Sequence, residues 1–252
     1  MLFDSHAHLD DEKFDIDRET VIEALKGEGL SYVVNIGADM ESSRKCVELA
    51  KKYDFIYAAV GVHPHEAAQM TDADLAELEE LSKHEKVVAI GEIGLDYHYD
   101  DTDEEAQKLW FKKQLALAQK LNLPFIVHDR DAHADTLEII KEVGYFNGVM
   151  HCFSGSAQMA ADVVKMGMYV SLAGTVTFKN APKAQAVASS VPLDKLLIET
   201  DCPYLTPEPF RGKRNNPSNV KCTAMKISEL RGISYEELAK ITLENAKKFY
   251  NI

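Results

Sequence analysis

The sequence predicts one α/β domain over residues 1–252, folded as a single TIM-type (β/α)8 barrel. Eight short, apolar, β-branched runs alternate with amphipathic stretches along the whole chain. Such alternation indicates parallel strands joined by right-handed helical crossovers. A length of 252 residues is also typical of one such barrel. The alternative is an open doubly wound sheet, which is disfavoured because no glycine-rich phosphate loop follows the first apolar run.

The expected strands share the apolar, β-branched composition and lie at residues 2–6, 31–36, 56–62, 87–91, 124–128, 148–152, 168–172 and 196–201. Helical periodicity lies between them, at residues 17–28, 41–53, 73–84, 103–122, 132–143 and 156–166. Two further helices are expected near 218–231 and 235–249. The clearest helix is 103–122, with acidic residues in its first turns and Asn122 before Pro124 as a stop signal. Residues 202–219 hold four of the eight prolines and predict a loop after the eighth strand.

Charge and cysteine content exclude several classes of protein. The 28 basic and 41 acidic residues leave a net charge of −13, which disfavours gripping long duplexes through a basic face. This net charge remains compatible with binding of one phosphate or one strand end at a metal site. The four cysteines form no CxxC pair, so neither a disulfide framework nor a thiolate zinc site is expected. No signal-peptide pattern and no apolar run of ~18 residues occurs, so we expect a cytoplasmic protein with no membrane or obligate protein partner.

Polar side chains follow the ends of several expected strands, where barrel enzymes carry their catalytic groups. Each alone has an ordinary explanation: a His-X-His pair in a loop, a salt bridge at the rim, or an acid capping a turn. Together, four imidazoles and two carboxylates suit two divalent ions, zinc or manganese before magnesium, which prefers oxygen ligands. The predicted metal ligands are His6, His8, Glu92, His128, His151 and Asp201.

Motifs along nearly the whole chain resemble the TatD family of metal-dependent deoxyribonucleases. They are DSHAHLD at 4–10, GVHPH at 61–65, GEIGLDY at 91–97, VHDRDA at 127–132, HCFSG at 151–155, SLAGTVTFKNA at 171–181, ETDCPYLTP at 199–207 and PFRGKRNNPSN at 209–219. The resemblance implies a barrel hydrolase related to amidohydrolases, with two metal positions that share Glu92. His6, His8 and Asp201 complete one position, and His128 with His151 completes the other. It also implies a DNA substrate, either single-stranded or bound at its 3′ ends.

The expected chemistry is attack of a metal-activated water on a phosphodiester. Glu92 and Asp201 are the expected catalytic residues, with Asp201 taking the proton of the attacking water. The expected substrate-binding residues are His63, Arg130, Lys179, Tyr204 and Arg211. Lys213, Arg214 and Phe210 are further candidates, with ordinary surface charge or loop packing as the alternative.

Two other functions compete with the nuclease. An amidohydrolase-type hydrolase of a small ester, amide or phosphotriester would use the same metals. The loop at 202–219 discriminates between this hydrolase and the nuclease, because a cationic groove favours phosphodiesters and a closed apolar pocket favours small neutral substrates. A non-catalytic metal-binding scaffold is disfavoured, because a scaffold has no need to retain every ligand.

Overall fold

The computed structural model describes residues 1–99 and 103–252. Its strands follow one another in the sheet in the order of the sequence, with parallel neighbours. They are β1 (Leu2–Ala7), β2 (Leu30–Ile36), β3 (Ile56–Val60), β4 (Val87–Asp96), β5 (Phe125–Arg130), β6 (Gly148–Met150), β7 (Tyr169–Leu172) and β8 (Leu196–Ile198). The predicted TIM-type (β/α)8 fold is therefore confirmed.

The helices occupy the segments between and after the strands. They are α1 (Arg18–Leu25), α2 (Met40–Lys52), α3 (Asp72–Leu81), α4 (Glu104–Leu121), α5 (His133–Val143), α6 (Ala157–Lys165), α7 (Pro182–Ser190), α8 (Val220–Arg231) and α9 (Tyr235–Tyr250). Helix α4 begins and ends as its sequence predicts: Asp103 accepts a hydrogen bond from the Ala106 N–H, and Asn122 ends it in the left-handed conformation. Helix α7 was not among the expected helices, and its first residue is a proline, which suits a helix N-terminus.

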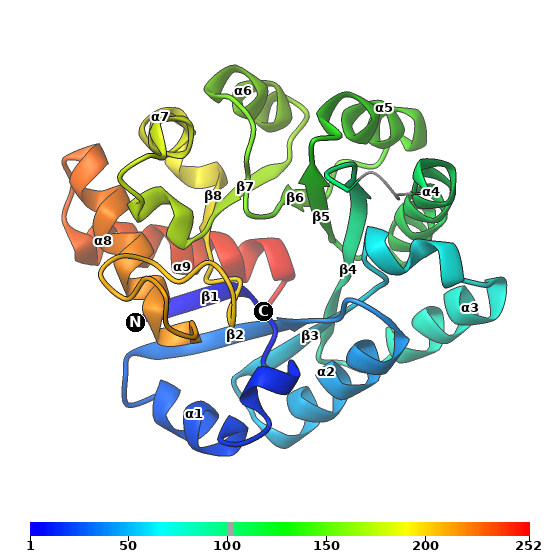
Figure 1. Ribbon diagram of the computed structural model, residues 1–252, viewed down its shortest axis with the longest axis horizontal. Coiled ribbons are helices and arrows are strands. Elements are labelled where there is room, and N and C mark those ends of the chain that lie inside the picture. The colour runs from blue at the N-terminus through cyan, green and yellow to red at the C-terminus, as the bar shows by residue number, and fades with distance from the viewer. Residues whose placement is uncertain (100–102) are drawn as a thin grey trace. The chain divides into compact units, whose positions relative to one another are not determined.

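The chain forms two compact units, which we describe separately. The first comprises residues 1–35 and 152–252. In it β1 pairs with β2, β7 pairs with β8, and a parallel bridge joins Ala7 to Cys202. Helix α9 packs against β1 and β8 (Figure 1), and the Tyr250 hydroxyl donates a hydrogen bond to the Ser5 carbonyl.

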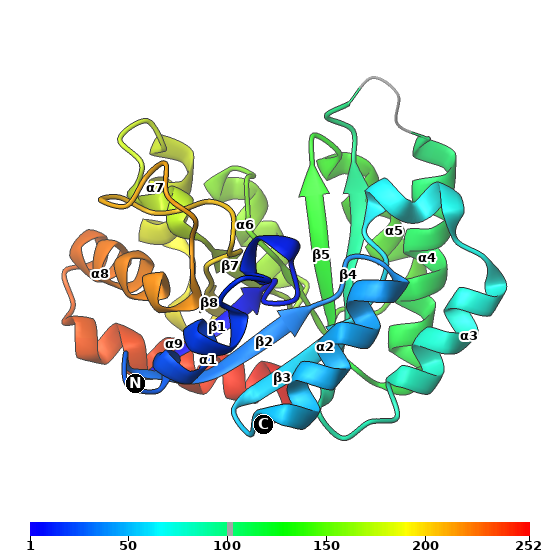
Figure 2. The same cartoon turned by 60° about the horizontal axis from the view of Figure 1, so that its bottom comes forward.

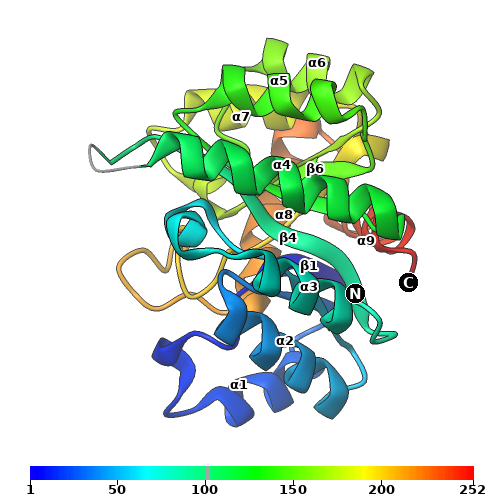
Figure 3. The ribbon, with the colours of Figure 1, turned by 90° about the vertical axis from the view of Figure 1, so that its right-hand side faces the viewer.

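The second unit comprises residues 36–151 and contains β3 to β6. Strands β4 and β5 run side by side as its longest extended pair (Figure 2), with register partners as far as Asp96 and Arg130. Helix α4 crosses the face of β4 (Figure 3) and presents two buried glutamines, Gln107 and Gln114, to the ends of neighbouring strands.

That residues 1–252 form a single domain stays a prediction.

Strand boundaries differ from the prediction mainly at β4, which continues to Asp96 rather than ending at residue 91. The additional residues are buried throughout, and they remain extended because they pair with β5. Strands β6 and β8 are shorter than predicted, so His151 and Asp201 lie just after their strands. Within residues 1–99 and 103–252, no helix combines the length and apolar character needed to span a lipid bilayer.

Candidate functional site

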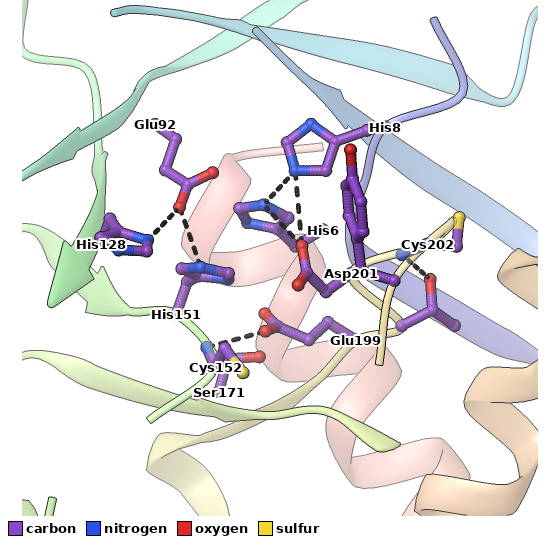
Figure 4. Close-up of polar contacts among 12 residues, drawn as sticks. His6, His8, Glu92, His128, His151, Cys152, Ser171, Glu199, Asp201 and Cys202 are labelled. Atoms are coloured by element: carbon purple, nitrogen blue, oxygen red, sulfur yellow. Dashed lines mark hydrogen bonds and ion pairs between the residues drawn. The ribbon is translucent and has the colours of Figure 1, made fainter. Parts of the chain in front are cut away.

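In the first unit, three predicted metal ligands converge. His6 lies within β1, His8 follows it, and Asp201 lies after β8. The Nε2 atoms of the two imidazoles are 3.1 Å apart. Asp201 Oδ1 lies 3.4 Å from His8 Nε2 and 3.7 Å from His6 Nε2. Figure 4 shows the three side chains directed toward one another.

The backbone around this cluster is tied together by hydrogen bonds between β1 and the chain after β8. The Asp201 N–H donates to the His6 carbonyl, and the His8 N–H donates to the Cys202 carbonyl. Asp201 has a φ of 54°, a left-handed conformation that aspartate tolerates better than most residues. These hydrogen bonds fix the backbone at both strand ends. The Asp201 carboxylate therefore faces the two imidazoles from a backbone that is itself held in place.

Two residues before His6, β1 carries a buried carboxylate that the prediction did not assign. Asp4 is fully buried and accepts hydrogen bonds from the backbone N–H of Thr200 at 2.9 Å and from its hydroxyl at 2.5 Å. Burial raises the pKa of Asp4 well above its usual value, although the bonds from Thr200 act in the opposite direction. Asp4 thus anchors the residue that precedes Asp201.

In the second unit, Glu92 stands between two histidines (Figure 4). Its Oε1 lies 2.8 Å from His128 Nδ1 and 2.9 Å from His151 Nε2. Only 3% of Glu92 is exposed, so its charge depends on these neighbours rather than on water. His63 Nε2 lies 3.9 Å from the same oxygen. The donor atoms of His63, Glu92 and His128 all lie within 4.8 Å of one another.

Asp96 holds His128 from the opposite side of its ring. His128 Nε2 lies 2.9 Å from Asp96 Oδ2, and Asp96 is 1% exposed. Burial favours protonation of Asp96, but the hydrogen bonds from His128 and from the His98 N–H leave its pKa well below the usual value. For His128, burial lowers the pKa, and the bonds to Asp96 and Glu92 outweigh burial and raise it. A carboxylate on the far nitrogen orients a metal-binding imidazole.

The sequence does contain a signal for Asp96. Glu92 and Asp96 are four residues apart in one strand, a spacing that places both side chains on the same face. The prediction ended this strand at residue 91 and assigned no role to Asp96.

His63 is held as a neutral ring with a defined orientation. Its Nδ1 accepts a hydrogen bond from the His65 N–H at 3.2 Å. Burial lowers the pKa of His63 well below its usual value, and the nearby His128 lowers it further. Since Nδ1 is the acceptor, the ring hydrogen is on Nε2, which can donate to a substrate oxygen.

The donor atoms fit divalent metal ions. Ligand nitrogens on one tetrahedral zinc lie about 3.3 Å apart, because each Zn–N bond is about 2.0–2.1 Å. The separations of 3.1, 3.4 and 3.7 Å among His6, His8 and Asp201 lie near that value. The Glu92 pairs at 2.8 and 2.9 Å have hydrogen-bond lengths, and a cation can take the place of the shared hydrogens. Imidazole with carboxylate is a donor set that suits zinc or manganese.

The expected substrate-binding residues lie on both units. His63 and Arg130 belong to the second, where the Arg130 guanidinium lies 5.6 Å from the centre of the Tyr99 ring. Lys179, Tyr204 and Arg211 are exposed residues of the first unit.

Contacts restrict what some of these residues can do. The ammonium of Lys13 lies 4.0 Å from the centre of the Tyr204 ring, so one face of that ring is covered. The Tyr204 hydroxyl donates to Asp11. Arg214 forms a two-point ion pair with Asp17, which disfavours it as a phosphate ligand.

Comparison with known proteins identifies relatives over the full length of the chain. The family model described as TatD related DNase matches residues 3–251. An uncharacterized metal-dependent hydrolase of Bacillus subtilis strain 168, YabD, is 53% identical, with 100% of both chains covered. YcfH of Escherichia coli K12, also named an uncharacterized metal-dependent hydrolase, is 37% identical over 100% of this chain and 96% of its own.

A solved structure shows the same fold over the whole chain. The crystal structure of YJJV, a TatD homologue from Escherichia coli K12, has a TM-score of 0.94 and 32% identity, covering 100% of this chain and 98% of that one. Both the sequence relatives and this structure match the chain from end to end, including the strand ends that carry the histidines and carboxylates described above. The chain therefore belongs to the TatD family of metal-dependent hydrolases.

Proposed function

We propose that the protein hydrolyses phosphodiester bonds of DNA at single-stranded or 3′ ends, with two divalent ions held by His6, His8, Glu92, His128, His151 and Asp201. The observation that carries the proposal is the pair of donor clusters. The donors around Asp201 lie near the separation expected on one zinc ion, and the Glu92 carboxylate contacts two imidazoles. The family description, TatD related DNase, supports the nuclease activity.

The metal ions would activate a water molecule and neutralise charge on the phosphoryl oxygens. Glu92 would hold one position together with His128 and His151, because its Oε1 contacts both imidazoles and its side chain is buried. That Glu92 is also shared with the other position is what the family resemblance implies. The Asp201 side chain is 16% exposed, so its carboxylate remains accessible to an attacking water and can accept its proton.

Substrate contacts would come from neutral and cationic donors around these clusters. His63 can donate from Nε2 to a phosphoryl oxygen. Arg130, Lys179 and Arg211 would supply positive charge in a chain whose net charge is −13. Because most of the protein repels a polyanion, a short strand end suits it better than a long duplex.

The loop at 202–219 favours the phosphodiester over a small neutral substrate. It exposes Phe210, Arg211 and Lys213 to solvent. An aromatic ring with neighbouring cations suits a nucleic-acid strand. A hydrolase of small esters or amides would instead need an enclosed apolar pocket with few polar groups.

The test is a hydrolysis assay on labelled single-stranded DNA, duplex DNA and model esters, with Mg²⁺, Mn²⁺ or Zn²⁺ added to metal-free protein. We expect cleavage of single strands that is lost in Glu92→Ala and retained in Glu77→Ala, whose exposed carboxylate pairs with Arg44. Turnover of model esters without any DNA cleavage would replace the nuclease with the amidohydrolase-type alternative. Metal binding without either activity would favour the scaffold.

A further inference from the structure

Two buried glutamines on α4 make the same unusual pair of contacts. The Asp96 N–H donates to Gln107 Oε1 at 2.8 Å, and Gln107 Nε2 donates to the Asp96 carbonyl at 3.1 Å. The Val62 N–H donates to Gln114 Oε1 at 2.8 Å, and Gln114 Nε2 donates to the Val62 carbonyl at 3.0 Å. Each side-chain amide therefore makes, for one residue, the two backbone hydrogen bonds that a neighbouring strand would otherwise make.

The two glutamines act from one face of one helix. They are seven residues apart, a spacing of two helical turns, and are 3% and 1% exposed. Each meets one N–H and one carbonyl, so the orientation of each amide follows from its partners. Buried glutamine loses side-chain freedom and requires full hydrogen bonding, so two such residues cost free energy that apolar residues would not.

The residues they hold lead directly to the site. The peptide after Val62 belongs to His63, whose own N–H donates to the Ala38 carbonyl. On the other side, the Ser43 hydroxyl receives the Gly61 N–H at 3.1 Å and donates to the Gly61 carbonyl at 3.0 Å. The short segment that carries His63 is thus fixed by side chains from two helices, α2 and α4.

Gln107 acts on His128, a histidine of the Glu92 cluster, through the carboxylate of Asp96. Gln107 fixes the backbone of Asp96, and Asp96 Oδ2 lies 2.9 Å from His128 Nε2. With Nε2 occupied in this way, Nδ1 of the ring faces Glu92 at 2.8 Å. A displacement of Asp96 would release the ring from that orientation.

We propose that Gln107 and Gln114 are positioning residues, with Gln107 orienting His128 through Asp96 and Gln114 orienting His63 through the Val62 peptide. The role of Gln107 rests on the proposed metal site, and that of Gln114 on the proposed substrate contact. The two glutamines therefore affect different steps: Gln107 affects metal binding, and Gln114 affects substrate binding.

The experiment compares Gln107→Met and Gln114→Met with Gln119→Met, a change at an exposed position of the same helix. Mn²⁺ affinity is measured by titration of metal-free full-length protein, and KM and kcat are measured on labelled single-stranded DNA. All measurements are made below the melting temperature of each variant. A variant that does not fold is replaced by the asparagine variant, which keeps the amide one methylene out of reach.

We expect Gln107→Met to weaken Mn²⁺ binding by about 10- to 100-fold. We expect Gln114→Met to raise KM about tenfold while its Mn²⁺ affinity stays within twofold of the wild type, and Gln119→Met to change neither. Asp96→Asn should also weaken Mn²⁺ binding, and adding Gln107→Met to it should cause little further loss, because both changes act on the same histidine. Nitrogen-15 spectra of the side chains should show mixed tautomers of His128 only in the variants at residues 96 and 107.

Loss of thermal stability in both methionine variants, with metal affinity and KM unchanged, would reduce the glutamines to structural residues and overturn the inference. Equal loss of metal affinity in both variants would overturn the division of roles. A wild-type protein that binds no Mn²⁺ or Zn²⁺ would instead contradict the proposed function. A wild type that binds metal but does not cleave DNA would contradict only the proposed DNA substrate. The Mn²⁺ affinity of Gln107→Met would still test the role of Gln107.

Discussion

The guanidinium of Arg211 lies over the ring of Phe178, with its central carbon 3.8 Å from the ring centre. Phe178 follows a short helical turn after β7, whereas Arg211 belongs to the loop after β8. The Glu208 N–H donates to the Thr177 hydroxyl at 2.9 Å, so the loop is tied to this turn at a second point. These contacts restrict the Arg211 side chain, which would reduce the entropy lost if it binds a phosphate as proposed.

From this stacking we predict that Arg211→Lys and Phe178→Leu both weaken binding of single-stranded DNA. A lysine cannot keep the planar stack, and a leucine removes the surface beneath the guanidinium. The expected rise in KM is about tenfold for each, equivalent to about 1.4 kcal/mol. For Arg211→Gln, the slope of log affinity against log salt should fall by about 0.7, as for one lost phosphate contact on a single strand. Arg44→Gln, which breaks an exposed pair with Glu77, is the control and should leave KM unchanged.

The carboxylate of Asp201 is predicted to be needed for turnover more than for binding of DNA. Asp201→Asn keeps the size of the side chain but removes the proton acceptor and the negative charge beside His6 and His8. We expect kcat to fall by about 10²- to 10⁴-fold, with a much smaller change in KM. Asp194→Asn, at an exposed position before β8, serves as the matched control. An Asp201→Asn enzyme with unchanged kcat would favour the scaffold function.

Removal of metal is predicted to lower stability as well as activity. A ligand that binds only the folded state stabilises it by about 2.7 kcal/mol when its free concentration is one hundred times the dissociation constant. Dialysis against a chelator should therefore lower the melting temperature of the wild type, and Mn²⁺ or Zn²⁺ should restore it. The melting temperature of Glu92→Ala should respond less to the chelator, because one shared ligand is missing. Identical melting curves with and without chelator would contradict a high-affinity metal centre.

The pair formed by Asp17 and Arg214 predicts a contribution to stability that depends on pH. The hydrogen bonds from Arg214 lower the pKa of Asp17 from its usual value of 3.8. Because the folded-state pKa is the lower one, the contribution is present above the unfolded-state pKa and is lost as pH falls through the folded-state pKa. The stability difference between wild type and Asp17→Asn should therefore shrink as pH falls below about 4. Urea unfolding at several pH values measures this difference, and a difference that grows toward low pH would have the wrong sign.

Within the first unit, the structure brings together three residues that the sequence predicts as metal ligands, and their role as ligands stays a proposal. Two histidines separated by one residue at the end of a strand share a face, because side chains alternate along a strand. His6 and His8 therefore have adjacent nitrogens, as their spacing predicts. Asp201 joins them because β1 and the chain after β8 are bridged at Ala7 and Cys202, a consequence of the strand order.

The residues that orient the ligands were harder to recognise from the sequence. Gln107 and Gln114 look like polar positions of an amphipathic helix, and nothing in their spacing shows that they face strand ends rather than solvent. Arg214 looks like a free cation in a basic loop, yet it pairs with Asp17, which is almost two hundred residues earlier.

The amino-acid pattern alone predicted the type of fold and the candidate metal ligands and substrate-binding residues, whose roles stay proposals. These depend on local periodicity and on the direction in which side chains leave a strand, both of which are encoded over a few residues. Tertiary structure alone decided that β4 extends to Asp96, that Asp96 orients His128, and that the two glutamines of α4 hold strand ends. A hydrogen bond between distant segments depends on which backbone groups the rest of the fold leaves without partners, and that depends on the packing of the entire unit.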